Sequence, residues 1–347
     1  LEDKLSDRLH EELTKTFIDK RASVLSRGLK QDISFDTKIL NEEEVMINNQ
    51  YIGLLKGLKL DLDLKIDALD TDIKSLKKAA KQNVSPEIIN RINQIIDTGL
   101  IKLNNDYKIY WKNHPIAKLI PGSDYLNPQI HLVIDEMIEK DEKIKLNNYL
   151  QIWINTKIKT ELKSLIDLKN IKEHNAELRA LAYHLYENNG VVKRENVSEY
   201  LKKLNQEERK KLRRIGVKFG RYHIFLFNLF KPSSVLLRVL LWKIFYEKNI
   251  SLSPPTFGLN FLEEKKHVNK DFMLICGFEK FDNFFIRIDI LERLFMKIIN
   301  SKEEKEIKMI PEMLNLLGCS KENFKKLLTK MNYKVFEKEK EIYFKYN

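Results

Sequence analysis

The stretch PEMLNLLGCSKENFKKLLTKMNYKVFEKEKEIYFKYN, residues 311–347, decides the fold of the C-terminal part. Its apolar residues recur first at helical spacing and then in alternation, with Gly318 and Ser320 between the two helical runs. An amphipathic helix over residues 285–299 precedes it. This order of helix, helix–turn–helix and two-stranded wing predicts a winged-helix-like domain over residues 285–347. The elements within the stretch are two helices, 311–317 and 321–331, and two strands, 333–336 and 341–344.

The N-terminal part has a different pattern. Residues 1–32 predict a connecting helix, because their leucines follow helical spacing. Residues 45–55 predict a hairpin turning at Asn48 and Asn49, since Asn tolerates the positive φ of a tight turn. A similar pattern returns 64 residues later, where Asn113, Ile116 and Leu119 repeat the positions of the first hairpin. A duplicated hairpin–strand–helix unit over residues 33–140 and a chance resemblance between two hairpins both fit this match.

The middle of the chain predicts helices punctuated by glycines. Residues 141–250 form a helical domain with a basic, Gly-containing loop, and Pro232 suits the first turn of a buried helix. The Ser/Pro-rich run at 251–257 indicates a loop, so residues 251–284 are predicted as a linker. The predicted fold class is therefore α+β, mainly α, with a hairpin-containing N-terminal part, a helical middle and a C-terminal winged-helix-like domain.

Several classes of protein are excluded by composition. No run reaches the roughly 18 apolar residues of a membrane span, and no signal peptide is present, so we expect a cytoplasmic protein without a membrane partner. The two cysteines, Cys276 and Cys319, stand alone, and the histidines lack metal-ligand spacing. The chain opens at Leu1 without an initiator Met, which suggests a segment of a larger protein.

The chain lacks a phosphate-binding loop, because none of its eleven glycines is followed by Lys. We therefore predict no catalytic residue, cofactor or metal site in this chain, and expect it neither to bind nor to hydrolyse ATP. The segment ending in Asp135 and Glu136 resembles a magnesium-binding strand, but the better interpretation is a helix start with two acids in its first turn.

The best binding candidate is the segment 202–221, which holds nine basic residues against two acidic ones within a chain of net charge +12. Gly216 and Gly220 would let the backbone approach a ligand, while arginines and a histidine could contact phosphates or bases. A solvated helix face followed by a packed turn is the alternative. The candidate nucleic-acid-binding residues are Lys210, Lys211, Arg213, Arg214, Lys218, Arg221 and His223.

A second candidate surface lies on the last predicted helix, with Lys321, Lys325 and Lys326. The second helix of a helix–turn–helix can read a groove of nucleic acid. This helix has lysines but no arginine, so bracing of a neighbouring domain is the interpretation we favour.

Four stretches together carry a resemblance: residues 7–25, residues 212–226 (LRRIGVKFGRYHIFL), residues 287–294 and residues 311–320. They resemble, in the same order, the C-terminal region of alphaproteobacterial superfamily 2 helicase-like proteins related to the mitochondrial degradosome RNA helicase. In that family two motor domains precede this region and bind ATP and magnesium. Phe227 departs from the family pattern, which has proline there.

The resemblance implies that the intact protein is an ATP-dependent RNA helicase with motor domains in cis. Together with the charge of segment 202–221, it leads us to predict a non-catalytic accessory region that binds single-stranded RNA and supports the motor. Two alternatives remain open: a scaffold or docking module for a nuclease or other partner, and a winged-helix DNA-binding regulator.

Overall fold

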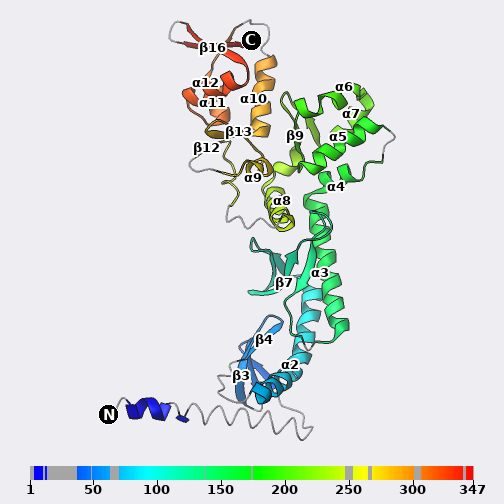
Figure 1. The fold of residues 1–347 in the computed structure, drawn as a ribbon, viewed down its shortest axis with the longest axis vertical. Helices are drawn as coiled ribbons and strands as arrows, with labels where there is room; N and C mark the ends of the chain where they lie inside the picture. The colour runs from blue at the N-terminus through cyan, green and yellow to red at the C-terminus, as the bar shows by residue number, and fades with distance from the viewer. Residues whose placement is uncertain are drawn as a thin grey trace. The chain divides into compact units, whose positions relative to one another are not determined.

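The computed structural model describes most of the chain in two compact units, Leu1–Ile154 and Asn155–Asn347 (Figure 1). Each unit is treated by itself. Residues 4–10 are helical, and most of the predicted connecting helix over residues 1–32 lies outside the described residues, as does Asn48 of the predicted turn. The described residues are 4–10, 12–13, 37–47, 49–62, 70–136, 138–172, 175–246, 253–264, 268–300, 306–338 and 341–346.

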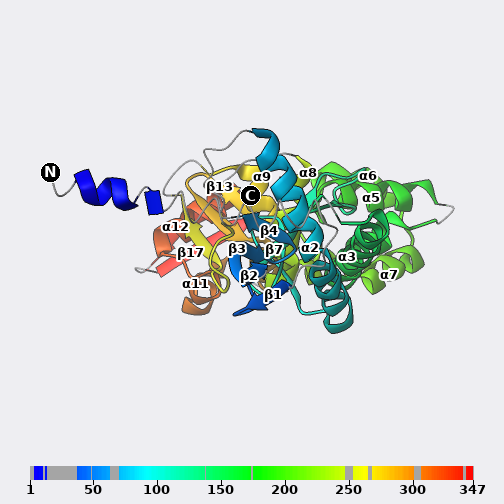
Figure 2. The same cartoon turned by 90° about the horizontal axis from the view of Figure 1, so that it is seen from below.

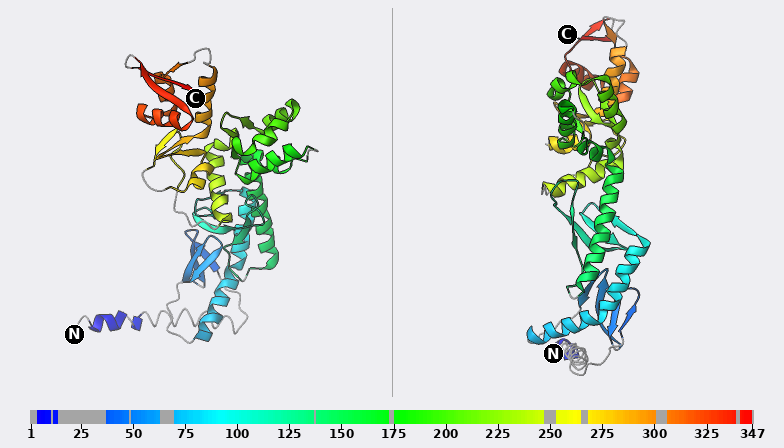
Figure 3. Two further views of the ribbon diagram at one scale, coloured as in Figure 1. Left: turned by 45° about the horizontal axis from the view of Figure 1, so that its top comes forward. Right: turned by 90° about the vertical axis from the view of Figure 1, so that its right-hand side faces the viewer.

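The first unit contains two four-stranded antiparallel sheets, each with its strands in sequence order and each followed by a long helix (Figure 3). The first set is β1 (Thr37–Leu40), β2 (Glu44–Ile47), β3 (Gln50–Lys56), β4 (Lys59–Leu62) and α2 (Asp70–Thr98). The second is β5 (Ile101–Leu103), β6 (Lys108–Trp111), β7 (His114–Ile120), β8 (Gln129–Leu132) and α3 (Lys140–Glu161), whose last turns enter the second unit.

The two sets follow one plan at an offset of 64 residues. Both second hairpins carry a register shift at the equivalent place, between Val45 and Met46 in one and between Ile109 and Tyr110 in the other. A loop between β7 and β8 that is longer than the β3–β4 turn then changes the offset to 70, which the first residues of α2 and α3 keep. Equivalent backbone hydrogen bonds join Leu55 N–H to Glu43 O (2.7 Å) and Leu119 N–H to Tyr107 O (2.8 Å).

Two details of the first unit differ from the sequence predictions. α2 runs unbroken through Pro86 and ends at Thr98, although the sequence pattern predicts two separate helices, over residues 66–81 and 86–103. Gly99, at φ +64°, turns the chain into β5, so residues 101–103 form a strand. Asp135 does not lie in the first turn of a helix: it precedes α3, is buried, and pairs with Lys81 at 2.7 Å.

The second unit is built from three consecutive modules, of which the first and third have the order of a winged helix and the second has a single described helix between its first two strands. In each three-stranded sheet the last strand lies between the other two, in the orders β10-β11-β9, β12-β14-β13 and β15-β17-β16. In the first and third modules this arrangement places a helix–turn–helix on one side of a hairpin, the wing, and in the second the single helix Lys270–Ile275 takes that place. The C-terminal winged-helix-like domain predicted from the sequence is the third of these modules.

The first module is α5 (Ala176–Glu187), β9 (Val191–Lys193), α6 (Ser198–Lys203), α7 (Gln206–Ile215), β10 (Val217–Phe219) and β11 (His223–Leu226). The second is α8 (Pro232–Phe245), β12 (Phe261–Glu263), α9 (Lys270–Ile275), β13 (Phe278–Phe281) and β14 (Phe284–Arg287). The third is α10 (Ile288–Asn300), β15 (Ile307–Lys308), α11 (Pro311–Leu317), α12 (Lys321–Lys330), β16 (Tyr333–Lys338) and β17 (Glu341–Tyr346). Three short helices join or interrupt them: α4 (Lys163–Lys169), η1 (Glu195–Val197) and η2 (Phe227–Phe230).

The three wings begin alike. A residue in the left-handed backbone region ends the preceding helix and starts each hairpin: Gly216 (φ +110°), Gly277 (φ +89°) and Asn332 (φ +64°). The hairpins of the first two modules share one register at an offset of 61 residues, so that Val217 pairs with Leu226 as Phe278 pairs with Arg287. Local sequence therefore encodes the same helix-to-wing turn three times.

Two predicted segments differ in the structure. Residues 141–250 are mostly helical but also contain the sheet of the first module, whose strands have three or four residues each. Residues 251–284, predicted as a linker, contain strands and a helix of the second module. A short strand has too few alternating positions to stand out in the sequence. Among the described helices, none is long and apolar enough to cross a membrane.

Candidate nucleic-acid interface

The basic segment predicted from the sequence covers the end of α6, the first strand of the wing, and the whole of α7, which is the second helix of the helix–turn–helix in the first module (Figure 2). α7 begins at a capping box, in which Asn205 and Glu208 each accept the other's backbone N–H. It ends at Gly216, whose left-handed backbone starts the wing. Leu212 is buried, and four basic side chains on the rest of the helix surface are exposed: Lys210, Lys211, Arg213 and Arg214.

Arg209 belongs to the same segment, but its guanidinium binds backbone carbonyl oxygens. Its guanidinium donates to the carbonyl oxygens of Leu201 (2.6 Å) and Leu204 (3.3 Å). These bonds satisfy two carbonyls at the turn between α6 and α7. Arg209 therefore fixes the helix–turn–helix, whereas the exposed cations of α7 face solvent.

The wing continues the basic surface. Lys218 on β10 is exposed, and Arg221 is exposed in the turn between β10 and β11. The guanidinium of Arg213 lies over the ring of Phe219, 5.4 Å from its centre, and so connects the helix to the wing. The helix and the wing thus present six cations on the two elements with which a winged helix contacts nucleic acid.

His223 does not join this surface. Only 3% of it is exposed, and its ring lies between two carboxylates from the other modules. Nδ1 lies 3.0 Å from Glu292 of α10 and Nε2 lies 3.5 Å from Glu279 of β13. Burial alone would lower the pKa of His223, but the hydrogen bonds and charges of Glu279 and Glu292 outweigh it and raise the pKa. His223 therefore lies in a buried cluster and not with the exposed cations of α7 and the wing, and its contact with nucleic acid stays a prediction.

The carboxylate of Glu292 binds the backbone of the wing turn in the first module. It accepts the backbone N–H groups of Arg221, Tyr222 (2.9 Å) and His223 (2.7 Å). A Cβ at Gly220 would lie 2.4 Å from this carboxylate, so only glycine fits there. Three donors converging on one buried carboxylate fix the position of the turn, and with it the position of Arg221.

The carboxylate of Glu279 completes the cluster. It also pairs with Lys193 of β9 at 3.0 Å. Burial alone would raise the pKa of Glu279, but hydrogen bonds and charges from His223 and Lys193 lower it below its ordinary value. Residues from all three modules therefore meet in this cluster, which ties the modules together: Lys193 and His223 from the first, Glu279 from the second and Glu292 from the third.

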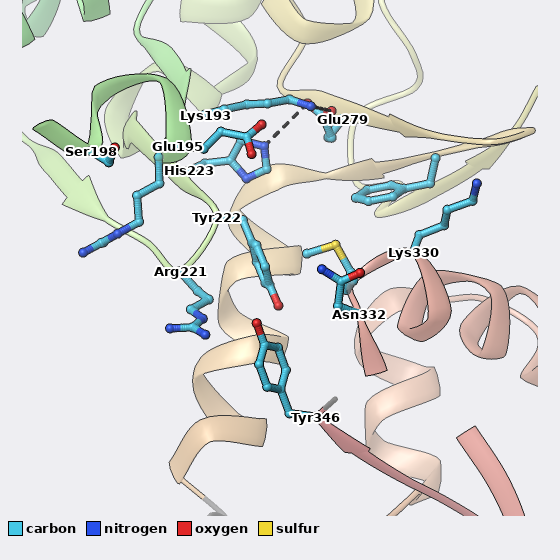
Figure 4. Close-up of a pocket in the computed structure, with 13 residues that line it drawn as sticks. Lys193, Glu195, Ser198, Arg221, Tyr222, His223, Glu279, Lys330, Asn332 and Tyr346 are labelled. Carbon is cyan, nitrogen blue, oxygen red and sulfur yellow. Dashed lines mark ion pairs between the residues drawn. The ribbon is translucent and has the colours of Figure 1, made fainter. Parts of the chain in front are cut away.

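A cavity of about 520 Å³ lies beside the cluster, where the three modules meet (Figure 4). The hydroxyl groups of Tyr222 and Tyr346 point toward each other across it, with Arg221 on one side and Lys330 on the other. Its lining comes from the first module (Lys193, Arg194, Glu195, Ser198, Arg221, Tyr222, His223), the second (Glu279, Phe281) and the third (Lys330, Met331, Asn332, Tyr346).

The second candidate surface, on α12, has a different setting. Lys321 and Lys326 are exposed and Lys325 is half-buried. Both ends of the helix contact the second module, since Asn323 donates to Glu263 (3.1 Å) and Lys330 pairs with Asp282 of the second wing (2.8 Å). The structure thus brings these lysines onto a helix that packs against its neighbour, apart from the residues of α7.

The described part of the chain holds no group of three His, Cys, Asp or Glu side chains placed to bind a metal ion. Cys276 is buried and Cys319 half-buried, and both are free thiols. Burial raises the pKa of Cys276 to about 12, which keeps it protonated near neutral pH.

Sequence reasoning missed Glu279 and Glu292, which lie far along the chain from His223 and belong to no local motif. One signal in the sequence could have shown that these segments are related. The hairpin pattern of residues 216–226 recurs at residues 277–287, and each of the two segments forms a wing. Comparisons of the chain with protein-family models, curated proteins and solved structures found no match.

Proposed function

We propose that this chain is an RNA-binding accessory region, in which α7 and the wing of the first module hold single-stranded RNA. The observation that supports the proposal most is the placement of six exposed cations on α7, β10 and the wing turn. Phosphate groups supply most of the affinity of nucleic acids for proteins, and Arg and Lys neutralise them. The resemblance to helicase-like proteins supports RNA as the ligand and motor domains in the same protein as the neighbours.

The first module suits this role better than the other two. In the second module the equivalent helix, α9, exposes Lys270 and Asp271, whose charges cancel, and buries most of its remaining side chains. In the third module, α12 has no arginine and is packed at both ends. Arginine matters because its planar guanidinium binds phosphate through two donors and stacks on bases.

The test is the salt dependence of RNA binding. Arg213, Arg214, Lys218 and Arg221 are replaced together by Ala, and the affinity for a single-stranded oligonucleotide is measured over a range of salt concentrations. Loss of four phosphate contacts should weaken binding and flatten the slope of log affinity against log salt by about three units, at about 0.7 per contact on a single strand.

A matched control removes the same number of charges from the first unit. Lys59, Lys102, Lys118 and Lys140 are exposed there, and their replacement by Ala also lowers the net charge of +12 by four. If both variants weaken binding equally, the effect is one of overall charge and the proposed interface is wrong. Unchanged binding in both favours a scaffold or docking module, and a strong preference for duplex DNA favours a DNA-binding regulator.

A further inference from the structure

We infer that the cavity between the three modules binds one nucleotide of the RNA strand held by α7 and the wing. This inference rests on the proposed function, because Arg221 belongs both to the wing and to the rim of the cavity. A strand that follows α7 and β10 to the wing turn reaches the cavity next. The volume of about 520 Å³ lies in the range of roughly 300–1,000 Å³ usual for small-ligand sites.

Two arginines provide the binding groups for a phosphate. Arg194 donates to the carbonyl oxygen of Gly220 at 2.7 Å, which holds its guanidinium at the wing turn. The position of Arg221 is set by the hydrogen bond from its N–H to Glu292. The two lysines of the lining are paired with carboxylates, Lys193 with Glu279 and Lys330 with Asp282. The positive charge available to a ligand therefore comes mainly from Arg194 and Arg221.

Tyr346 provides a surface for stacking a base. It is 56% exposed, although its ring packs edge-on against Tyr333 at 5.3 Å. The guanidinium of Arg221 lies over the ring of Tyr346, 5.9 Å from its centre. An exposed aromatic ring beside an arginine is the combination that stacks bases in proteins that bind single strands.

The charges of the cavity also orient the nucleotide. Glu195 and Glu279 both lie among the lining residues, near His223, and would repel a phosphate placed beside them. The phosphate is therefore expected at Arg194 and Arg221, with the base turned inward. The polar side chains of Ser198 and Asn332, which also line the cavity, can form hydrogen bonds to the base edge or the ribose.

The test uses the full chain and an oligouridylate carrying 5-iodouridine. Tyr346→Leu removes the aromatic ring at an exposed position, whereas Tyr346→Phe keeps it. Loss of one stacked base should weaken binding about fivefold or more in the Leu variant, while the Phe variant stays within about twofold of the parent. Ultraviolet crosslinks, mapped by mass spectrometry, should occur at Tyr346 in the parent and be absent in the Leu variant.

Tyr183→Leu is the matched control, because Tyr183 is 61% exposed on α5 of the same unit and does not line the cavity. It should bind RNA as the parent does. Equal affinity of Tyr346→Leu and the parent, with crosslinks only in α7 or β10, would overturn the nucleotide site and leave the proposed function standing. No binding of RNA by the parent chain would overturn both.

Discussion

The first and third modules of the second unit share one topology and use the same helix differently. In the first, α7 faces solvent with Lys210, Lys211, Arg213 and Arg214. In the third, the equivalent α12 carries lysines, and its Asn323 and Lys330 contact the second module. The order of elements in a winged helix therefore does not by itself specify a nucleic-acid-binding domain. The exposed side chains of one helix, and what covers its ends, decide its use.

The wing turns of the first and second modules both contact the third module. The turn of the first wing lies on the carboxylate of Glu292, which comes from the first helix of the third module. The turn of the second wing carries Asp282, which pairs with Lys330 of the third module. Both wings thus join the modules, because the turn of each contacts a residue of the third module.

The largest effect is expected on the free energy of unfolding when the carboxylate of Glu292 is removed. Glu292→Ala leaves three backbone N–H groups, one buried and two part-buried, and the buried ring of His223 without their carboxylate partner. Loss of one member of a buried ionic cluster should lower the free energy of unfolding by about 3–5 kcal/mol, measured by urea denaturation. Glu312→Ala, at an exposed position of α11, is the control and should change it by less than about 0.5 kcal/mol. A Glu292→Ala variant as stable as that control would contradict the role of the cluster.

A smaller effect is expected when pH changes the contribution of His223 to the free energy of unfolding. The folded state raises the pKa of His223 above its ordinary value of 6.5, so its stabilising contribution is complete below about pH 6.5 and is lost as pH rises through the folded pKa. The pKa of Glu279 is lowered from 4.5, so its contribution is lost only in more acidic solution. The parent should therefore exceed His223→Gln in unfolding free energy by more at about pH 6 than at about pH 9. A difference that stays constant or grows with pH would show that His223 is not held as a cation.

The smallest effect is expected on RNA affinity when the lysines of α12 are replaced. Reversing the charges of Lys321, Lys325 and Lys326 to Glu should leave RNA affinity within about threefold of the parent, a change under roughly 0.7 kcal/mol. The same reversal at Lys210, Lys211 and Arg214 of α7 should weaken binding more than about tenfold, because repulsion replaces attraction at phosphate contacts. Melting temperatures of both variants show whether they fold. A tenfold loss in a folded α12 variant would make the third module a second RNA-binding site.

The sequence allowed the third module to be predicted, because Gly318 and Ser320 separate two helices whose buried faces are regular and the wing strands have six residues each. The first module was missed as a winged helix, since β9 and β10 have three residues each and give no alternation. The basic residues of α7 were predicted from local charge. The burial of His223 was not, because it depends on Glu279 and Glu292, which approach it only in the folded chain.

The central claim is that α7 and its wing, and not α12, bind RNA. It is tested most directly by the slope of log affinity against log salt for a single-stranded oligonucleotide, measured in one series for three proteins. These are the parent, the Ala variant of Arg213, Arg214, Lys218 and Arg221, and the Ala variant of Lys321, Lys325 and Lys326. We expect the slope to flatten by about three units in the first variant and to stay unchanged in the second. Equal slopes in the parent and the first variant, or flattening only in the second, would contradict it.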